Sequence, residues 1–281
     1  MKFGVNTFIW ESPFSTQSLD LIKKVKVMGF DVFEVAVEDP HLIDGPALKS
    51  ALDEAGLSAI ICGAFGPDRD ISSTEAVIRD NCKTYLRSCI DLAVIVGSPC
   101  VCGPMYSAVG NKRLLSADEK AAERARSVAG LREIADYAAE RGICLAFETL
   151  NRFENDMINT VDQAISLIDE IDRKNVGLHL DTFHMHIEEK DSAAAIRAAG
   201  GRLYHFHASE NDRGVPGTGQ VHWQEVAAAL KDIHYQGAVV IESFTPQVTS
   251  IAAAVCLWRS WAPDQDTIGR EGLKFLKNLL G

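Results

Sequence analysis

The chain has 281 residues, of which 47% are hydrophobic and 24% are charged, the balance of an ordinary globular protein. Its formal net charge of −11 argues against a nucleic-acid partner, because phosphate binding usually needs a basic surface. No apolar run is long enough to cross a membrane, and the N-terminus lacks the apolar core of a secretion signal, so we expect a cytoplasmic protein with no membrane partner.

The chain contains seven cysteines, an odd number, and no C-x-x-C motif. Cys100 and Cys102 form a C-x-C pair, which is too short for a structural zinc site. We therefore expect buried free thiols, with a disulfide or redox role as the minority alternative.

Short apolar runs alternate with longer segments of helical period along the whole chain. The expected strands are, in order, residues 2–8, 32–37, 57–63, 99–105, 143–149, 176–182, 203–209 and 238–244. Between them, Ser116 with Glu119 and Thr160 with Gln163 have the spacing of a capping box, which begins a helix. The glycines expected to end helices in a left-handed conformation are Gly29, Gly56, Gly97, Gly142 and Gly237.

Strands that alternate with helices predict an α/β fold with parallel pairing and right-handed crossovers. Eight such units favour a closed (β/α)₈ TIM barrel over an open doubly wound sheet, and no G-x-G-x-x-G follows the first strand. No linker or low-complexity segment interrupts the pattern, so residues 1–281 are expected to form a single domain. The segment from about Asp264 to Gly281 predicts an extra C-terminal helix outside the barrel.

Ionisable residues end the last four expected strands, where a TIM barrel places its active site. These residues are Glu148, Asp181, His207 and Glu242. Three carboxylates in one cavity repel one another and stay ionised only if a cation neutralises them. Oxygen ligands with one imidazole suit Mn²⁺, Mg²⁺ or Co²⁺ better than a structural zinc. The sequence therefore predicts one divalent metal ion; the alternative is that each acid pairs with a nearby basic side chain.

Three more polar residues, Glu154, His184 and Arg213, lie in the loops that follow these strands. All three can reach a substrate bound at the metal. A histidine and an arginine can stabilise negative charge on a substrate oxygen. For Glu154 and Arg213 the alternative is a solvated loop charge.

The segment LHLDTFHMHIEE is rich in histidines and acids, but barrel geometry predicts one metal ligand there, Asp181. His179 lies two residues earlier on the same inward face, one layer deeper, and we expect a hydrogen-bonded core histidine or one behind the ligands. His186, Glu188 and Glu189 are expected to lead into the next helix, where acids favour the N-terminal dipole.

Five segments resemble the D-tagatose 3-epimerase family, which includes D-psicose (D-allulose) 3-epimerases and L-ribulose 3-epimerases among the xylose-isomerase-like barrels. The segments are ETLNRFEN, LHLDTFHMHIEE, HFHASENDRG, PGTGQVHW and IESF. The likeness spans most of the chain. It departs in the first and third strands, at Asn6 and at CGAFG (62–66), whose loops shape the pocket that selects the sugar.

The resemblance implies an isomerase that epimerises free keto-sugars at C3, with a monosaccharide substrate of the D-tagatose, D-fructose, D-psicose or L-ribulose type. It implies Mn²⁺, or Co²⁺ or Mg²⁺, held by the four strand-end residues and stabilising a cis-enediolate. Glu148 and Glu242 match the acid/base pair, while Glu154, His184 and Arg213 match the substrate-binding residues. A homodimer or homotetramer is also implied.

Other functions fit the same pattern. One is another metal-dependent enediolate enzyme on this barrel: an aldose–ketose or hydroxypyruvate isomerase, or an inosose dehydratase. An endonuclease-IV-like metallohydrolase would need several zinc ions and a basic face, which the net charge of −11 disfavours. A sugar-binding barrel without catalytic activity is a further alternative.

Overall fold

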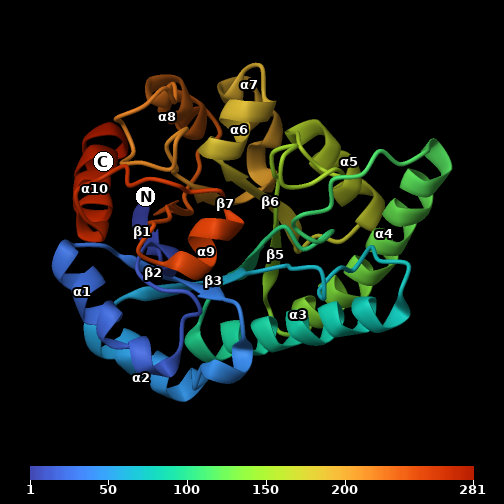
Figure 1. Ribbon diagram of the computed structural model, residues 1–281, viewed down its shortest axis with the longest axis horizontal. Coiled ribbons are helices and arrows are strands. Elements are labelled where there is room, and N and C mark those ends of the chain that lie inside the picture. Colours follow the sequence, from blue (N-terminus) through green and yellow to red (C-terminus); the bar gives the residue numbers. More distant parts are fainter.

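The computed structural model describes residues 1–281, and its parallel strands close into a barrel surrounded by helices (Figure 1). The strands are β1 Lys2–Asn6, β2 Val32–Val37, β3 Ser58–Gly63, β4 Cys100–Gly103, β5 Cys144–Glu148, β6 Val176–Asp181, β7 Leu203–His207 and β8 Ala238–Ile241. Each strand pairs with its neighbours in chain order, and β1 pairs with β8 to close the barrel. The predicted (β/α)₈ fold is confirmed.

The helices follow the strands around the outside of the barrel. They are α1 Asp20–Met28, α2 Gly45–Ala55, α3 Ala76–Val96, α4 Ala117–Ala139, α5 Val161–Ile171, α6 Thr182–Glu188, α7 Ser192–Ala199, α8 Trp223–Asp232, α9 Thr249–Ala254 and α10 Gln265–Leu280. In Figure 1 the short helix α9 lies over the middle of the barrel rather than in the outer ring. Its Ala252 packs with Phe8 and Phe244, so α9 covers one side of the barrel mouth. None of the helices combines the length and hydropathy that a membrane crossing requires.

The expected C-terminal helix is α10, which lies beside the N-terminal strand at the left of Figure 1. The carboxylate of Asp264 accepts a hydrogen bond from the Thr267 N–H (2.7 Å) and so caps its first turn. Leu273 and Leu276 are buried in the main hydrophobic core. The apolar face of α10 thus explains why the tail packs onto the barrel instead of extending from it.

Both predicted capping boxes are present, at the starts of α4 and α5. The helix ends agree less well with the prediction. Gly29, Gly56 and Gly97 end α1, α2 and α3 with positive φ. Gly142 also has positive φ, although it follows the α4 cap by two residues.

The expectation for Gly237 was wrong, because α8 ends earlier and His234 is the residue with the left-handed conformation (φ 54°). The His234 N–H bonds back to the Lys231 carbonyl (3.0 Å), which closes the helix end there. Gly237 is favoured for a different reason. A Cβ at this position would lie 2.4 Å from the Tyr235 hydroxyl, so a side chain there would force the Tyr235 ring to move.

Five cysteines are buried as free thiols, which agrees with the prediction: Cys62, Cys82, Cys89, Cys100 and Cys102. Burial raises the pKa of the Cys82 and Cys89 thiols to about 12, so these groups stay protonated and unreactive. Cys256 departs from the expectation, because it is exposed.

Candidate active site

The four predicted metal ligands meet at one end of the barrel. Glu148, Asp181 and His207 are the last residues of β5, β6 and β7, and Glu242 follows β8 by one residue. One potential ligand atom from each lies within 4.8 Å of the others, and all four side chains are buried. They converge because the parallel strands of a closed barrel end at a common rim.

The three carboxyl groups differ in their tendency to ionise. Burial and the nearby Glu242 raise the pKa of Glu148 well above its ordinary value. Burial also raises the pKa of Asp181, although Arg213 opposes the shift. For Glu242 burial acts in the same direction, but His207 and Arg213 outweigh it and lower the pKa. The raised pKa values of Glu148 and Asp181 mean that ionising all three carboxyl groups together is unfavourable without a further positive charge.

His207 offers a free nitrogen to this cluster. Its Nε2 lies 2.7 Å from Glu34 Oε1, whereas its Nδ1 is buried, has no hydrogen-bond partner and lies 3.5 Å from Glu242 Oε2. A buried nitrogen without a partner, facing three carboxylates, is suited to binding a cation. The donor set of three carboxylates and one imidazole is suited to Mn²⁺, Co²⁺ or Mg²⁺.

Arg213 is not a solvated loop charge, which was the alternative for this residue. Its side chain is buried, and its Nη1 donates to Asp181 Oδ2 (2.7 Å) and to Glu242 Oε2 (3.0 Å). The guanidinium carbon also lies 4.0 Å from the centre of the Phe183 ring. Burial works against the charge of Arg213, but Asp181 and Glu242 raise its pKa above the ordinary value. Arg213 thus supplies a permanent positive charge beside the carboxylates.

His184 lies in helix α6 instead of the expected loop, and it presents a neutral imidazole to the same cavity. The Asn151 N–H donates to its Nδ1 (3.1 Å), so the ring proton resides on Nε2. That Nε2 lies 3.6 Å from Glu148 Oε1. Burial, with the charge of Arg213 as a smaller cause, lowers the pKa of His184 well below its usual range. His184 can therefore donate a hydrogen bond to a substrate oxygen.

Glu154 lies on the loop after β5 and is half-buried. Its Oε1 accepts a hydrogen bond from Asn151 Nδ2 (2.8 Å), and burial raises its pKa. The solvated alternative for this residue does not hold either. Glu154 instead forms part of the cavity wall beside His184.

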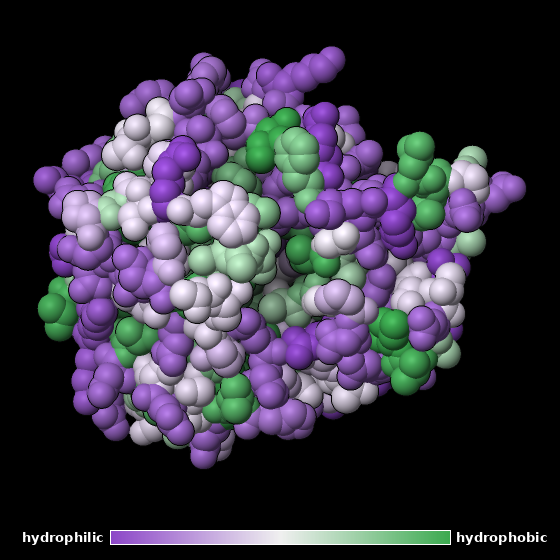
Figure 2. Space-filling model, in the orientation of Figure 1, coloured by the Kyte–Doolittle hydropathy of each residue, from purple (hydrophilic) through white to green (hydrophobic).

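A cavity of about 370 Å³ opens above the cluster. Its polar end is formed by Glu148, Glu154, His184, Arg213 and Glu242. Its other walls are largely apolar and include Phe8, Phe65, Val109, Phe244, Ile251 and Val255. Figure 2 shows a hollow near the middle of this face, with hydrophobic side chains in and around it. The cavity is large enough for a small ligand whose reacting atoms lie at the polar end.

His179 occupies the predicted inward position but lacks the expected hydrogen bond. Neither ring nitrogen has a hydrogen-bond partner, and the ring packs against the imidazoles of His205 and His207. Its ring centre lies 4.0 Å from that of His207, and its Nδ1 lies 3.8 Å from Glu148 Oε2. Burial lowers the pKa of His179 well below its usual range, so the ring is neutral.

The prediction for His186, Glu188 and Glu189 was wrong, since none of them begins the next helix. His186 and Glu188 lie in the last turn of α6, and Glu189 follows it. Glu188 accepts hydrogen bonds from the Arg152 backbone (2.7 Å) and guanidinium (2.9 Å). Glu189 accepts from the Val161 N–H (2.8 Å), so it stabilises the start of α5 instead.

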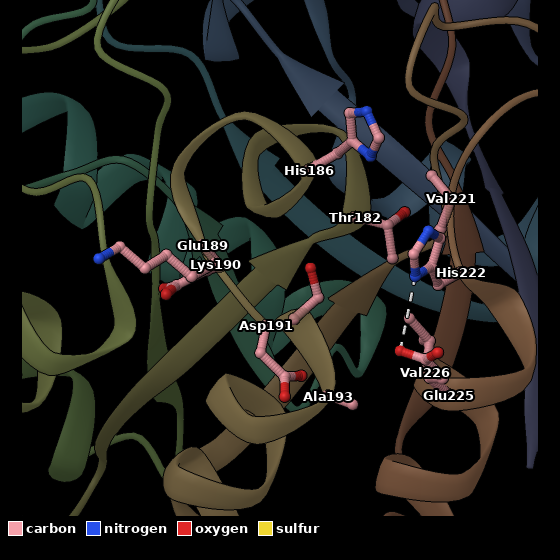
Figure 3. Close-up of a pocket in the computed structure, with 11 residues that line it drawn as sticks. Thr182, His186, Glu189, Lys190, Asp191, Ala193, Val221, His222, Glu225 and Val226 are labelled. Atoms are coloured by element: carbon pink, nitrogen blue, oxygen red, sulfur yellow. Dashed lines mark ion pairs between the residues drawn. The ribbon is translucent and has the colours of Figure 1, made fainter.

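A second cavity, of about 430 Å³, lies outside the barrel between α6, α7 and α8 (Figure 3). His186, Asp191, His222 and Glu225 are among its lining residues. The His222–Glu225 pair (3.5 Å) is exposed to solvent. The buried polar side chain of this cavity, Thr182, already donates to the Ser209 carbonyl (2.6 Å). This cavity therefore lacks the unpartnered buried groups found at the barrel end.

Glu34 and His205 belong to the site, and the sequence reasoning missed them. Glu34 is fully buried in β2, and its oxygens lie 2.7 Å from His207 Nε2 and 2.6 Å from His205 Nε2. Together with Cys102 these residues form another group of potential ligands. The Glu34–His207 distance is that of a hydrogen bond, and both oxygens lie too close to imidazole nitrogens to leave room for an ion. The available signal was a glutamate in the middle of the apolar run VFEVAV.

Glu210 organises the loop that carries Arg213. The Glu210 carboxylate is fully buried and accepts four hydrogen bonds, from the backbone of Asn211, Gly217 and Val221 and from Trp223 Nε1. The Glu210 carbonyl accepts from the Arg213 N–H (2.9 Å). The loop between β7 and α8 is thus folded around a single acceptor.

Glu210→Gln is expected to lower the free energy of unfolding by about 1–3 kcal/mol, because the new NH₂ group leaves buried donors unpaired. Denaturant unfolding measures this change. The control is Glu225→Gln on the exposed face of α8, for which a change within about 0.5 kcal/mol is expected. Equal stability of the two variants would contradict the role of Glu210.

Comparison with known proteins supports the same barrel fold and the same family along the chain. The family model described as "Xylose isomerase-like TIM barrel" matches residues 22–279. The L-ribulose 3-epimerase of Methylomonas sp. (strain DH-1) is 34% identical over 99% of this chain and 97% of the relative. The D-psicose 3-epimerase of Agrobacterium fabrum is 34% identical, with 100% of each chain covered.

Solved structures agree with these relatives. The crystal structure of D-allulose 3-epimerase from Methylomonas sp. in complex with D-allulose superposes with a TM-score of 0.93 at 34% identity, covering 99% of this chain and 97% of the other. The sequence identity, the coverage and the shared barrel lead to one assignment. The chain belongs to the ketose 3-epimerase family, within the xylose isomerase-like TIM barrels.

Proposed function

We propose that this protein is a metal-dependent ketose 3-epimerase acting on free keto-sugars of the D-tagatose, D-fructose, D-psicose or L-ribulose type. The observation that carries the proposal is the meeting of two glutamates of the cavity wall, Glu148 and Glu242, with the buried, unpartnered Nδ1 of His207 beside them. The L-ribulose and D-psicose 3-epimerases among the full-length relatives support the substrate class.

The metal ligands in this proposal are Glu148, Asp181, His207 and Glu242, with Mn²⁺ as the metal and Co²⁺ or Mg²⁺ as alternatives. When bound, the metal supplies a charge that polarises the sugar carbonyl and acidifies the C3–H. Glu148 and Glu242 come from β5 and from the end of β8, two separate parts of the barrel wall. One glutamate removes the C3 proton, and the other returns a proton to the opposite face, as inversion of a carbon centre requires.

Three residues of the cavity wall are proposed to bind the sugar. His184 Nε2 and the Arg213 guanidinium donate to oxygens on which negative charge develops, and Glu154 accepts from a hydroxyl group. Arg213 is the one lysine or arginine among the cavity residues, and it already contacts Asp181 and Glu242. This charge pattern favours an unphosphorylated sugar, since a phosphate would need a further positive group.

The test is to incubate the Mn²⁺-loaded protein with fructose, tagatose or ribulose in D₂O. Deuterium at C3, seen by NMR together with the C3 epimer, is the expected result. Deuterium at C1 or C2 with formation of an aldose would instead identify an aldose–ketose isomerase, and loss of water would identify a dehydratase. Either outcome would contradict the proposal.

Metal affinity is expected to fall as the pH is lowered, because protons compete for the same ligand atoms. The pKa of Glu148 is raised by burial and by Glu242, and that of His207 is raised by Glu34 and Glu242 although burial opposes this shift. Both shifts make protons compete with Mn²⁺ for these two groups at a higher pH than for unperturbed side chains. Calorimetry of Mn²⁺ binding in buffers of different ionisation enthalpy should detect proton release, and binding without proton release would contradict the expectation.

A further inference from the structure

A second layer of the site lies behind the four candidate ligands and centres on Glu34. This residue lies in the interior of β2, where every side chain is buried, and its own exposure is 0%. Its hydrogen-bond and ion-pair partners are Asn6, Cys102, His205 and His207, and they include no lysine or arginine. A carboxylate buried this deeply needs hydrogen-bond donors on both oxygens to remain in the barrel interior.

Both carboxylate oxygens of Glu34 are held in place. Oε1 accepts from Asn6 Nδ2 (2.7 Å) and faces His207 Nε2 (2.7 Å), while Oε2 lies 2.6 Å from His205 Nε2. The Asn6 amide is itself fixed, because its Oδ1 accepts from the Phe8 N–H (2.9 Å) at the start of a short 3-10 helix. The orientation of Asn6 thus leaves its NH₂ group pointing at Glu34, and Glu34 has little freedom to turn away.

This arrangement determines where His207 carries its proton. An ionised carboxylate only accepts hydrogen bonds, so the His207 nitrogen that contacts Glu34 must be the one that bears hydrogen. The lone pair of the neutral ring is then on Nδ1, the buried nitrogen without a partner that faces the Glu242 carboxylate. A metal-binding histidine is generally oriented in this way by a carboxylate on its other nitrogen.

We propose that Glu34 is a positioning residue that fixes His207 with its proton on Nε2 and so raises the affinity of the four-residue site for a divalent cation. This inference rests on the metal-dependent function proposed above. Glu34 touches neither the cavity nor the other three candidate ligands, so it acts through His207. Asn6, where the first strand departs from the family pattern, takes part in this arrangement, because its amide donates to the Glu34 carboxylate.

Calorimetric titration with Mn²⁺ tests the proposal without measuring any reaction. Glu34→Ala removes the acceptor, and about 10- to 100-fold weaker Mn²⁺ binding is expected. Glu34→Gln keeps one acceptor oxygen for His207, so an intermediate affinity is expected. The control is Glu123→Gln, which removes a buried carboxylate of α4 paired with Arg113, outside the barrel-end cavity. Its affinity should stay within about twofold of the wild type, since it touches no candidate ligand.

A second measurement uses the wild-type protein, so the test does not depend on the folding of the variants. In ¹⁵N NMR of the Mg²⁺-loaded protein, His207 should show hydrogen on Nε2 and none on Nδ1, with its signals identified by their loss in His207→Gln. Hydrogen on Nδ1 would overturn the proposal, and so would wild-type Mn²⁺ affinity in a folded Glu34→Ala variant. A protein that binds Mn²⁺ through this arrangement but fails to exchange deuterium at C3 would contradict the proposed function and leave the role of Glu34 intact.

Discussion

Replacing Glu148 or Glu242 by glutamine is expected to lower kcat/KM for ketose epimerisation by about 10²- to 10⁴-fold, the range for loss of a positioned acid or base. Glutamine keeps the shape of the side chain and one oxygen that can bind a metal, but it cannot take up or release the C3 proton. Both variants should lose activity, because inversion needs one group on each face of the carbon. Deuterium exchange at C3 and formation of the epimer at saturating Mn²⁺ measure the effect.

The matched control is Glu225→Gln, which changes an exposed glutamate on α8 that lies outside the barrel-end cavity. Its activity should equal that of the wild type. Full activity in either Glu148→Gln or Glu242→Gln would contradict the acid/base roles. Activity that is lost only at limiting Mn²⁺ would restrict the affected residue to metal binding.

Arg213→Met is expected to destabilise the metal-free protein by about 3–5 kcal/mol at neutral pH, the typical effect of removing one partner from a buried ion pair. Arg213 donates to both Asp181 and Glu242, and its loss would leave their charges buried without compensation. Methionine fills much of the same space, so the change reports mainly on charge. The loss should shrink at acidic pH, where a carboxyl group takes up a proton. Denaturant unfolding of the metal-free protein measures it.

Added Mn²⁺ should recover part of this stability, because a ligand that binds the folded state stabilises it by mass action. The control is Arg197→Met, which breaks an exposed pair with Asp232 (2.8 Å) and should change stability by at most about 1 kcal/mol. If Arg213→Met and Arg197→Met proved equally stable, Arg213 would not be the charge that holds the carboxylates together.

The pattern of the sequence was sufficient to predict that Glu148, Asp181, His207 and Glu242 meet. Each ends an apolar run in consecutive units, and a closed parallel barrel brings all strand ends to one rim. This step needs only the fold class and the order of the strands. Distances and side-chain directions were not required.

The environment of each side chain was much harder to predict. Arg213 and Glu154 had a solvated loop as an alternative, yet Arg213 is buried and Glu154 is half-buried in the cavity wall. Glu188 and Glu189 were assigned to the wrong helix, because their partners come from the loop after β5 and from the start of α5. The partners of loop residues depend on which groups lie nearby in the folded protein, and local sequence patterns do not encode this.

Glu34 shows the difference between what the sequence determines and what only the tertiary structure determines. By itself the sequence determined the barrel, its extra helix and the four strand-end residues. Hydrophobic periodicity and the order of the strands can be seen directly along the chain. Only the tertiary structure decided that Glu34 contacts His207, a residue 173 positions away, and that His207 Nδ1 remains free. Such contacts depend on how the barrel closes and on which donors reach a buried carboxylate. Those are properties of the packed interior, and they cannot be predicted from any single segment of the sequence.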